Sequence, residues 1–111
     1  MTPDEMKDLV AYVLDEIHAG NDDIVNDHPG LAEVLPAFQG ARHAIQDLTS
    51  EIVQQLVDGD WVVTRLMSSG VHVAEFMGMP PTNQHMNFET IMMHQIRSGS
   101  IVKQHSQGGP V

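Results

Sequence analysis

The chain has 111 residues, no cysteine, 15 acidic residues against five lysines and arginines, and a formal net charge of −10. A chain of this length is expected to form one domain whose core is large enough to fold without covalent staples. The absence of cysteine excludes a disulfide scaffold, a zinc finger, an iron–sulfur site and a thiol nucleophile. The shortage of cations argues against binding to nucleic acid or to an anionic membrane surface.

The negative charge is concentrated in residues 1–60. They hold 13 acidic residues against Lys7 and Arg42, a formal charge of −11, whereas residues 61–111 hold two acidic residues against three cations, a charge of +1. No apolar run approaches the roughly 18 residues of a membrane span, and the first ten residues are acidic where a secretory leader would be basic. We therefore expect a cytoplasmic protein with neither a membrane nor a nucleic-acid partner.

The first element predicted is a helix over residues 2–19. Thr2 and Glu5 form a capping-box pattern with Pro3 at the first helical position, and Gly20 is a natural stop at the other end. Apolar residues recur at helical spacing and form one face. They are Met6, Leu9, Val10, Val13 and Ile17.

A short acidic connection and a second helix are predicted next. Residues 21–30 end in His-Pro-Gly and form the connection, and the helix is predicted over residues 31–46. Pro36 fits only near the first turn of such a helix, because proline lacks the backbone N–H that an interior position needs. The apolar face of this helix is marked by Leu31, Val34, Leu35, Phe38, Ile45 and Leu48.

The rest of the chain has the hydrophobic period of β-strands. Asp58-Gly59-Asp60 and Ser98-Gly99 are turn signals, each flanked by two strand-like segments, and therefore predict two antiparallel hairpins. Two prolines and a glycine exclude regular structure over residues 76–84, and the tail 107–111 is expected to fray. The predicted strands are 51–58, 61–72, 86–97 and 100–106. Two helices followed by four antiparallel strands indicate an α+β fold, with the helices packed on one face of a curved sheet.

The strand region also carries a series of specific residues at defined spacing. In chain order they are Gly59-Asp60, Val62-Val63, Arg65, Gly70-Val71-His72, Phe76, Gly78, Pro80-Pro81-Thr82, Gly99 and Ile101. With these residues, segment 59–106 resembles the SnoaL-like polyketide cyclases (ester cyclases) of the nuclear transport factor 2-like superfamily. Residues 2–20 and 30–58 fit the family's earlier elements, and the family segment that corresponds to 21–29 is shortened here.

The resemblance implies a fold, an assembly and a pocket. The fold would be a single domain of residues 1–111, a cone-shaped, strongly curved antiparallel sheet packed with the N-terminal helices (a cystatin-like α+β barrel). The cone would hold an apolar pocket at its open end. Relatives pair through their sheet faces, so a homodimer is expected. The shortened segment leaves one wall of the pocket thinner, open or completed by a partner chain.

The resemblance also indicates where catalytic groups are expected. In the family an acidic residue just after the tryptophan of a Glu-x-Trp motif acts as the acid/base, aided by a polar residue on the preceding strand. The matching positions here are Ser106 and Met92, so the carboxylate is missing. His94 is the candidate base, because it shares a strand face with Met92 and a neutral imidazole accepts a proton near neutral pH. His105 is its candidate polar partner. For His94 the alternative is a histidine that fills a core position.

Several side chains are candidates for binding the substrate. Arg65 either pairs with a carboxylate such as Glu89 or orients a carbonyl of the ligand, because an unpaired charge in an apolar strand is costly. His28 either borders the pocket or is exposed, and Trp61 either packs beside its hairpin turn, as its position favours, or contacts the substrate. His72 is expected to hold the Pro-Pro-Thr turn. The candidate substrate-binding residues are Arg65, His28, Met92, Glu89, Trp61 and Ser106.

Three functions remain open on the sequence. The leading hypothesis is a pocket protein that performs proton transfer, without cofactor or metal, on a hydrophobic ketone or ester. The second is a non-catalytic ligand-binding or assembly module on the same fold. The third is an epoxide hydrolase or isomerase, which would need two carboxylates around a water.

Overall fold

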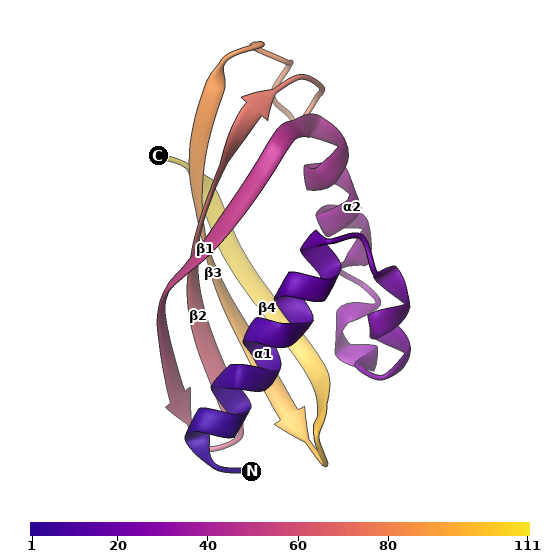
Figure 1. The fold of residues 1–111 in the computed structure, drawn as a ribbon, viewed down its shortest axis with the longest axis vertical. Helices are drawn as coiled ribbons and strands as arrows, with labels where there is room; N and C mark the ends of the chain where they lie inside the picture. Colours follow the sequence, from indigo (N-terminus) through magenta and orange to yellow (C-terminus); the bar gives the residue numbers. More distant parts are fainter.

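In the computed structural model, which describes residues 1–111, two helices precede a single four-stranded sheet (Figure 1). The helical elements are α1 (Pro3–His18), the 3₁₀ turns η1 (Asp22–Asn26) and η2 (Pro29–Leu31), and α2 (Leu35–Ala44). The strands are β1 (Ile45–Asp58), β2 (Trp61–His72), β3 (His85–Arg97) and β4 (Ser100–Pro110). None of the helices is long and apolar enough to cross a membrane.

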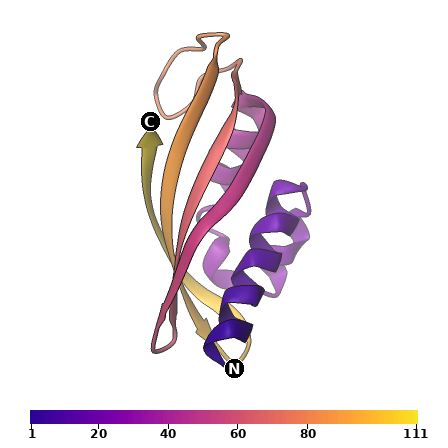
Figure 2. The ribbon, with the colours of Figure 1, turned by 60° about the vertical axis from the view of Figure 1, so that its left-hand side comes forward.

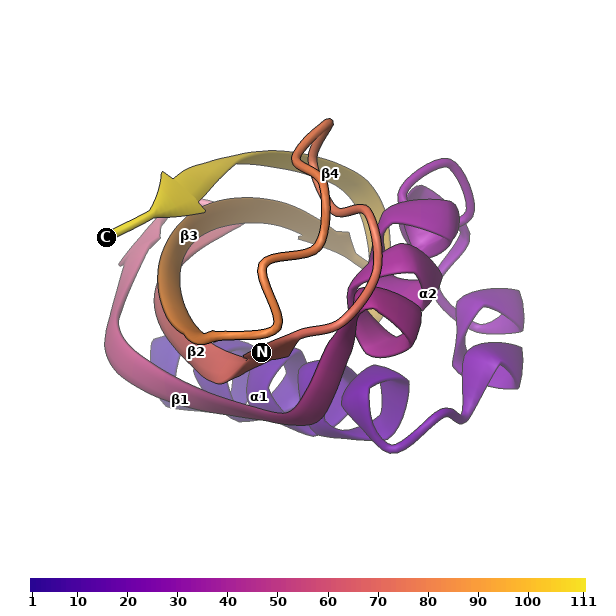
Figure 3. The ribbon, with the colours of Figure 1, turned by 90° about the horizontal axis from the view of Figure 1, so that it is seen from above.

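The sheet is antiparallel in the order β1-β2-β3-β4, and it curls without closing into a barrel (Figure 3). Gly59 turns β1 into β2, and Ser98 and Gly99 turn β3 into β4, each with a positive φ that suits a tight hairpin. Irregularities in the register of β1 with β2 and of β3 with β4 bend the strands further. The predicted α+β fold and both predicted hairpins are confirmed.

Helix α1 begins at the predicted capping box. The Glu5 amide donates to the Thr2 hydroxyl at 3.1 Å, and the Thr2 amide donates to the Glu5 carboxylate at 2.8 Å. The helix lies along the concave side of the sheet (Figure 2) and packs on β1 and β2. Its apolar face joins strand residues in one core cluster. The buried members from the helix are Met6, Val10, Val13, Leu14 and Ile17, and those from the strands include Val62, Leu66, Met92, Ile96 and Ile101.

The boundary between the second helix and the first strand differs from the prediction. Helix α2 spans Leu35–Ala44 with Pro36 in its first turn, and β1 begins directly at Ile45. The predicted helix over 31–46 is therefore too long at both ends, and the strand predicted at 51–58 is too short. Ile45 pairs with the buried His72 of β2, so the strand starts where sheet pairing outweighs the helical pattern.

The C-terminal tail is also ordered, contrary to the fraying expected for residues 107–111. Strand β4 continues to Pro110, which pairs with Phe88 of β3. This pairing outweighs the weak strand propensity of the two glycines in the segment. Gly108 also lies close against the backbone of β3, where a Cβ would stand 2.4 Å from the Glu89 carbonyl oxygen, so a residue without a Cβ fits there.

Candidate functional site

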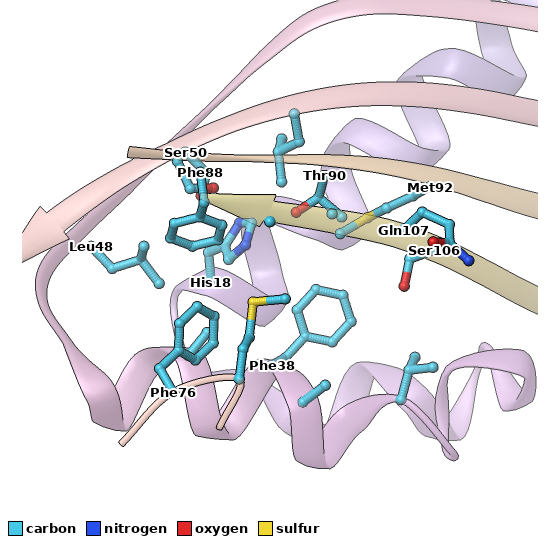
Figure 4. Close-up of a pocket in the computed structure, with 18 of the residues that line it drawn as sticks. His18, Phe38, Leu48, Ser50, Phe76, Phe88, Thr90, Met92, Ser106 and Gln107 are labelled. Atoms are coloured by element: carbon cyan, nitrogen blue, oxygen red, sulfur yellow. The ribbon is translucent and has the colours of Figure 1, made fainter. Parts of the chain in front are cut away.

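A cavity of about 370 Å³ lies on the concave side of the sheet, between α2 and the half of the strands that α1 leaves uncovered (Figure 4). Side chains from both helices, all four strands and the loop after β2 line it. Two aromatic rings of the lining, those of Phe76 and Phe88, pack together with centroids 5.3 Å apart. The apolar lining consists of Val34, Ala37, Phe38, Ala41, Leu48, Leu66, Phe76, Met77, Phe88 and Met92.

The polar side chains of the cavity are mostly hydroxyls and amides. The hydroxyls of Ser50 and Ser68, on neighbouring strands, lie 2.8 Å apart and share a hydrogen bond. No aspartate, glutamate, lysine or arginine is part of the lining. The polar members are His18, Ser50, Ser68, Thr90, Gln104, Ser106 and Gln107. A site of this kind suits a neutral molecule that presents a carbonyl or hydroxyl oxygen to the serines.

Strand register explains how Met92 and Ser106 meet in this cavity. Phe88, Thr90 and Met92 alternate along β3 and point to the concave face, as residues two apart do in a strand. Met92 pairs directly with Ser106 of β4. The two positions that match the family's polar helper and its acid therefore face each other across one side of the cavity.

His94 points to the same face as Met92 but does not line the cavity. It is 1% exposed and lies deeper in the core, where it pairs with Val62 and Gln104. Its Nε2 donates to the Gln104 Oε1 at 2.7 Å, and its buried Nδ1 has no partner. Burial lowers the pKa of His94, and the Gln104 hydrogen bond opposes this only in part. Burial therefore favours the neutral ring, and of the two hydrogen-bonded partners only Gln104 lines the cavity.

Four predicted site residues lie on the other face of the sheet, away from the cavity. Arg65 and Glu89 form an ion pair with 2.8 Å between Nε and Oε2. Of the two roles considered for Arg65, the structure therefore contains the pairing with a carboxylate. Trp61 and His105 stack beside each other with ring centroids 5.8 Å apart. None of the four is among the residues that line the cavity.

His28 is buried, and it makes a hydrogen bond within the core instead of lining the cavity. Its Nδ1 accepts a hydrogen bond of 3.0 Å from the Ile101 amide, which ties the start of η2 to β4. Burial lowers the pKa of His28. His72 holds the Pro-Pro-Thr loop through its backbone: its amide donates to the Gln84 carbonyl, and its carbonyl accepts from the Asn83 amide.

The sequence interpretation missed most of the polar lining. Ser68 and Thr90 follow the alternation of the apolar lining residues on their strands, Leu66 on β2 and Phe88 and Met92 on β3, and this signal could have identified them. His18 was missed as well, and nothing in its local pattern marks it. It reaches the cavity only because α1 ends beside α2, which is a property of the tertiary packing.

A family model for SnoaL-like polyketide cyclases matches residues 2–108. The chain belongs to this family. The match covers both helices and nearly all of the sheet, in agreement with the resemblance of the strand motifs. No curated protein sequence matches the chain at a significant level.

Solved structures share the whole fold at low sequence identity. AclR of Streptomyces galilaeus, a provisionally assigned hydroxylase, is 20% identical with a TM-score of 0.82, covering 97% of this chain and 91% of its own. A SnoaL-like polyketide cyclase of Agrobacterium tumefaciens is 18% identical with a TM-score of 0.79, covering 98% and 93%. IdmH of Streptomyces antibioticus, a provisionally assigned polyketide cyclase, is 25% identical with a TM-score of 0.73, covering 93% and 91%. These similarities establish the fold only, so the chemistry has to be inferred from the residues of the cavity.

Proposed function

We propose that this protein binds a neutral, hydrophobic ketone or ester in the cavity and transfers a proton on it without a cofactor, as a cyclase does. The observation that carries the proposal is the cavity itself, about 370 Å³ in volume, apolar on most of its wall and free of charged carboxylate, lysine and arginine side chains. Membership of the SnoaL-like cyclase family supports the same class of substrate.

The polar side chains can hold the reacting end of such a ligand. Ser50 and Ser68 share one hydrogen bond, so the hydroxyl that accepts it keeps its own proton free to donate to a carbonyl oxygen. Donation from a preorganised hydroxyl stabilises the negative charge that an enolate places on that oxygen. The apolar rings of Phe38 and Phe88 would flank the carbon skeleton. Epoxide hydrolysis by a carboxylate pair is not favoured, because no carboxylate lines this cavity.

Ligand binding is tested with a blocked variant and a matched control. Ala41 lines the cavity from α2, so Ala41→Phe places a ring inside it, whereas Ala32 is exposed and outside the lining, so Ala32→Phe adds the same ring to the surface. Polycyclic ketones, steroids, β-keto esters and epoxides are screened by thermal shift, since a ligand of the folded state raises the melting temperature.

A shift by one class of ketone or ester that Ala41→Phe abolishes and Ala32→Phe keeps would support the proposal. Shifts that survive in Ala41→Phe would place binding elsewhere and contradict it. Binding of a ligand without turnover would favour the second candidate function, a non-catalytic ligand-binding module. Met92 and Ser106 also favour this candidate, because they stand where the family has a polar helper and an acidic residue.

We also propose that two copies associate through the outer face of the sheet and that the protein acts in the cytoplasm. Leu56, Ile91 and Met93 are 56%, 43% and 39% exposed on that face, beside the Arg65–Glu89 pair. The chain from residue 61 onward, which contains β2, β3 and β4, is almost neutral, and nine of the 15 acidic residues lie in residues 1–44, which contain the helices. Pairing by the sheets would cover the apolar side chains and keep the two acidic parts apart.

A further inference from the structure

His18 is the one histidine among the residues that line the cavity, and no other lining residue has a side chain that titrates near neutral pH. The remaining polar members are hydroxyls and amides, which donate and accept hydrogen bonds but do not take up a proton in this range. A proton acceptor that touches a ligand in this cavity must therefore be His18 or a water molecule. Neither His94 nor His105 lines the cavity, and His105 stacks on Trp61 on the opposite face of the sheet.

The position of His18 is held by contacts on both sides. It is the last residue of α1 and half-buried, and its ring meets the ring of Phe38 edge-on with centroids 6.0 Å apart. Figure 4 shows the imidazole projecting from the end of α1 toward the interior that Phe38 and Phe88 border. The two ring nitrogens make no hydrogen bond to another residue, so they remain available to a ligand.

A cluster of polar groups fixes the end of α1 behind this ring. Arg42 of α2 donates to the carbonyl of Ile17, the residue before His18. The same guanidinium pairs with both carboxylate oxygens of Asp22 at 2.8 and 3.1 Å, and Gln39 donates to Asp22 at 3.0 Å. Arg42 is therefore a positioning residue that joins α1, η1 and α2 beside the cavity.

The surroundings of His18 favour the neutral form of its imidazole. Burial lowers its pKa, Asp15 of the same helix raises it, and Arg42 of α2 lowers it again. Asp22 of η1 is engaged by Arg42, and the lining residues of β1 to β4 carry no formal charge. A neutral imidazole in an apolar cavity is the form that accepts a proton.

We propose that His18 is the general base of this site and that the substrate is a hydrophobic ketone or ester with an acidic C–H next to its carbonyl. This inference rests on the proposed function. His18 takes the proton as the C–H bond breaks. The electron pair of that bond moves toward the carbonyl and forms an enolate, whose oxygen is bound by Ser50 or Ser68. In a cyclisation, the enolate carbon bonds to a second carbonyl carbon of the same molecule, and the imidazolium returns its proton to the new alkoxide. The net reaction is an isomerisation that needs no oxidant or reductant.

The test follows proton removal directly, so it does not require the natural substrate. 2-Tetralone, a bicyclic ketone with acidic C–H bonds, is incubated in D₂O, and NMR measures both its binding and the exchange of its protons for deuterium. The proteins compared are the wild type, His18→Gln, His94→Phe, Ala41→Phe and His43→Gln. His43 is an exposed residue of α2 outside the lining and serves as the surface-histidine control.

The expected result is exchange by the wild type and by His43→Gln that falls about 100-fold or more in His18→Gln, while tetralone still binds to His18→Gln. The wild-type rate should rise with pH and level off above a pKa that lies below the ordinary histidine value of 6.5. Circular dichroism confirms that His18→Gln is folded.

Three other results would overturn the inference, each in a distinguishable way. Full exchange by His18→Gln, with loss in His94→Phe, would assign the base to His94. Binding by the wild type with exchange no faster than in Ala41→Phe would leave a ligand pocket without this base. No binding of tetralone or of any ketone in the thermal-shift screen would overturn the proposed function and, with it, the role of His18.

Discussion

Replacing glycine by alanine is expected to have opposite effects on stability at two positions in the acidic half of the chain. Gly30 lies in η2 against β4, where an alanine Cβ would stand 2.3 Å from the Lys103 amide nitrogen and 2.3 Å from the Val102 carbonyl carbon. Gly40 lies in α2, and its Cβ would meet nothing within 4 Å. Neither glycine has a positive φ, so backbone strain does not enter the comparison.

The magnitudes follow from these distances. Real Cβ contacts essentially never fall below 3.0 Å, so Gly30→Ala must separate η2 from β4 by about 0.7 Å (3.0 − 2.3). Overpacking of this kind costs about 1–3 kcal/mol. Gly40→Ala replaces a poor helix former by the best one at an exposed position and stabilises the helix by about 1 kcal/mol. For a domain of this size, 1 kcal/mol corresponds to roughly 4 °C in the melting temperature.

Thermal unfolding at pH 7.5 measures both variants against the wild type. We expect Gly40→Ala to melt about 4 °C higher and Gly30→Ala roughly 4–12 °C lower. Neither residue lines the cavity, so both variants should keep the wild-type shift with a ketone ligand. A Gly30→Ala protein as stable as the wild type would refute the close packing of η2 on β4, and with it the placement of the His28 hydrogen bond. Destabilisation by Gly40→Ala would refute the exposed helix.

Three further predictions concern pH, assembly and the end of α1. The pKa values of the buried His28 and His94 are lowered, so the unfolded chain binds more protons and stability falls as the pH drops below about 6.5; thermal unfolding at pH 7.5 and 5.5 checks this, and an unchanged melting temperature would contradict it. Ile91→Glu on the outer sheet face should convert a dimer to a monomer in analytical ultracentrifugation, whereas Tyr12→Glu, an exposed change on α1, should not; a wild-type monomer would refute the dimer. Arg42→Met should lower the melting temperature more than Asp22→Asn does, because it also removes the hydrogen bond to the Ile17 carbonyl; the reverse order would contradict this.

The sequence predicted those features of the fold that local chemistry determines. Thr2 and Glu5 specify the start of α1, and the Asp-Gly and Ser-Gly turns specify both hairpins. The boundary at Ile45 and the order of the tail could not be predicted in this way. Both depend on pairing with distant strands, Ile45 with His72 and Pro110 with Phe88.

The candidate site shows the same limit more clearly. Strand alternation correctly puts Met92 and His94 on one face, but it cannot tell which of them borders a cavity and which is covered by a helix. The resemblance brought Met92 and Ser106 together, and the structure pairs them. The position of His18 in the cavity lining could not be predicted from the sequence, because no residue near it in the sequence lines the cavity.

The lengths of the elements explain why the cavity lies where it does. Helix α1 has 16 residues and is about 24 Å long, whereas β3 has 13 residues and extends about 43 Å. Even if α1 lay straight along the sheet, it could cover little more than half of the concave face. Ile96 packs with α1 in the core cluster, Met92 belongs both to that cluster and to the cavity lining, and Thr90 and Phe88 line the cavity further along the strand. The last residue of α1 must then stand at the boundary between core and cavity, and that residue is His18.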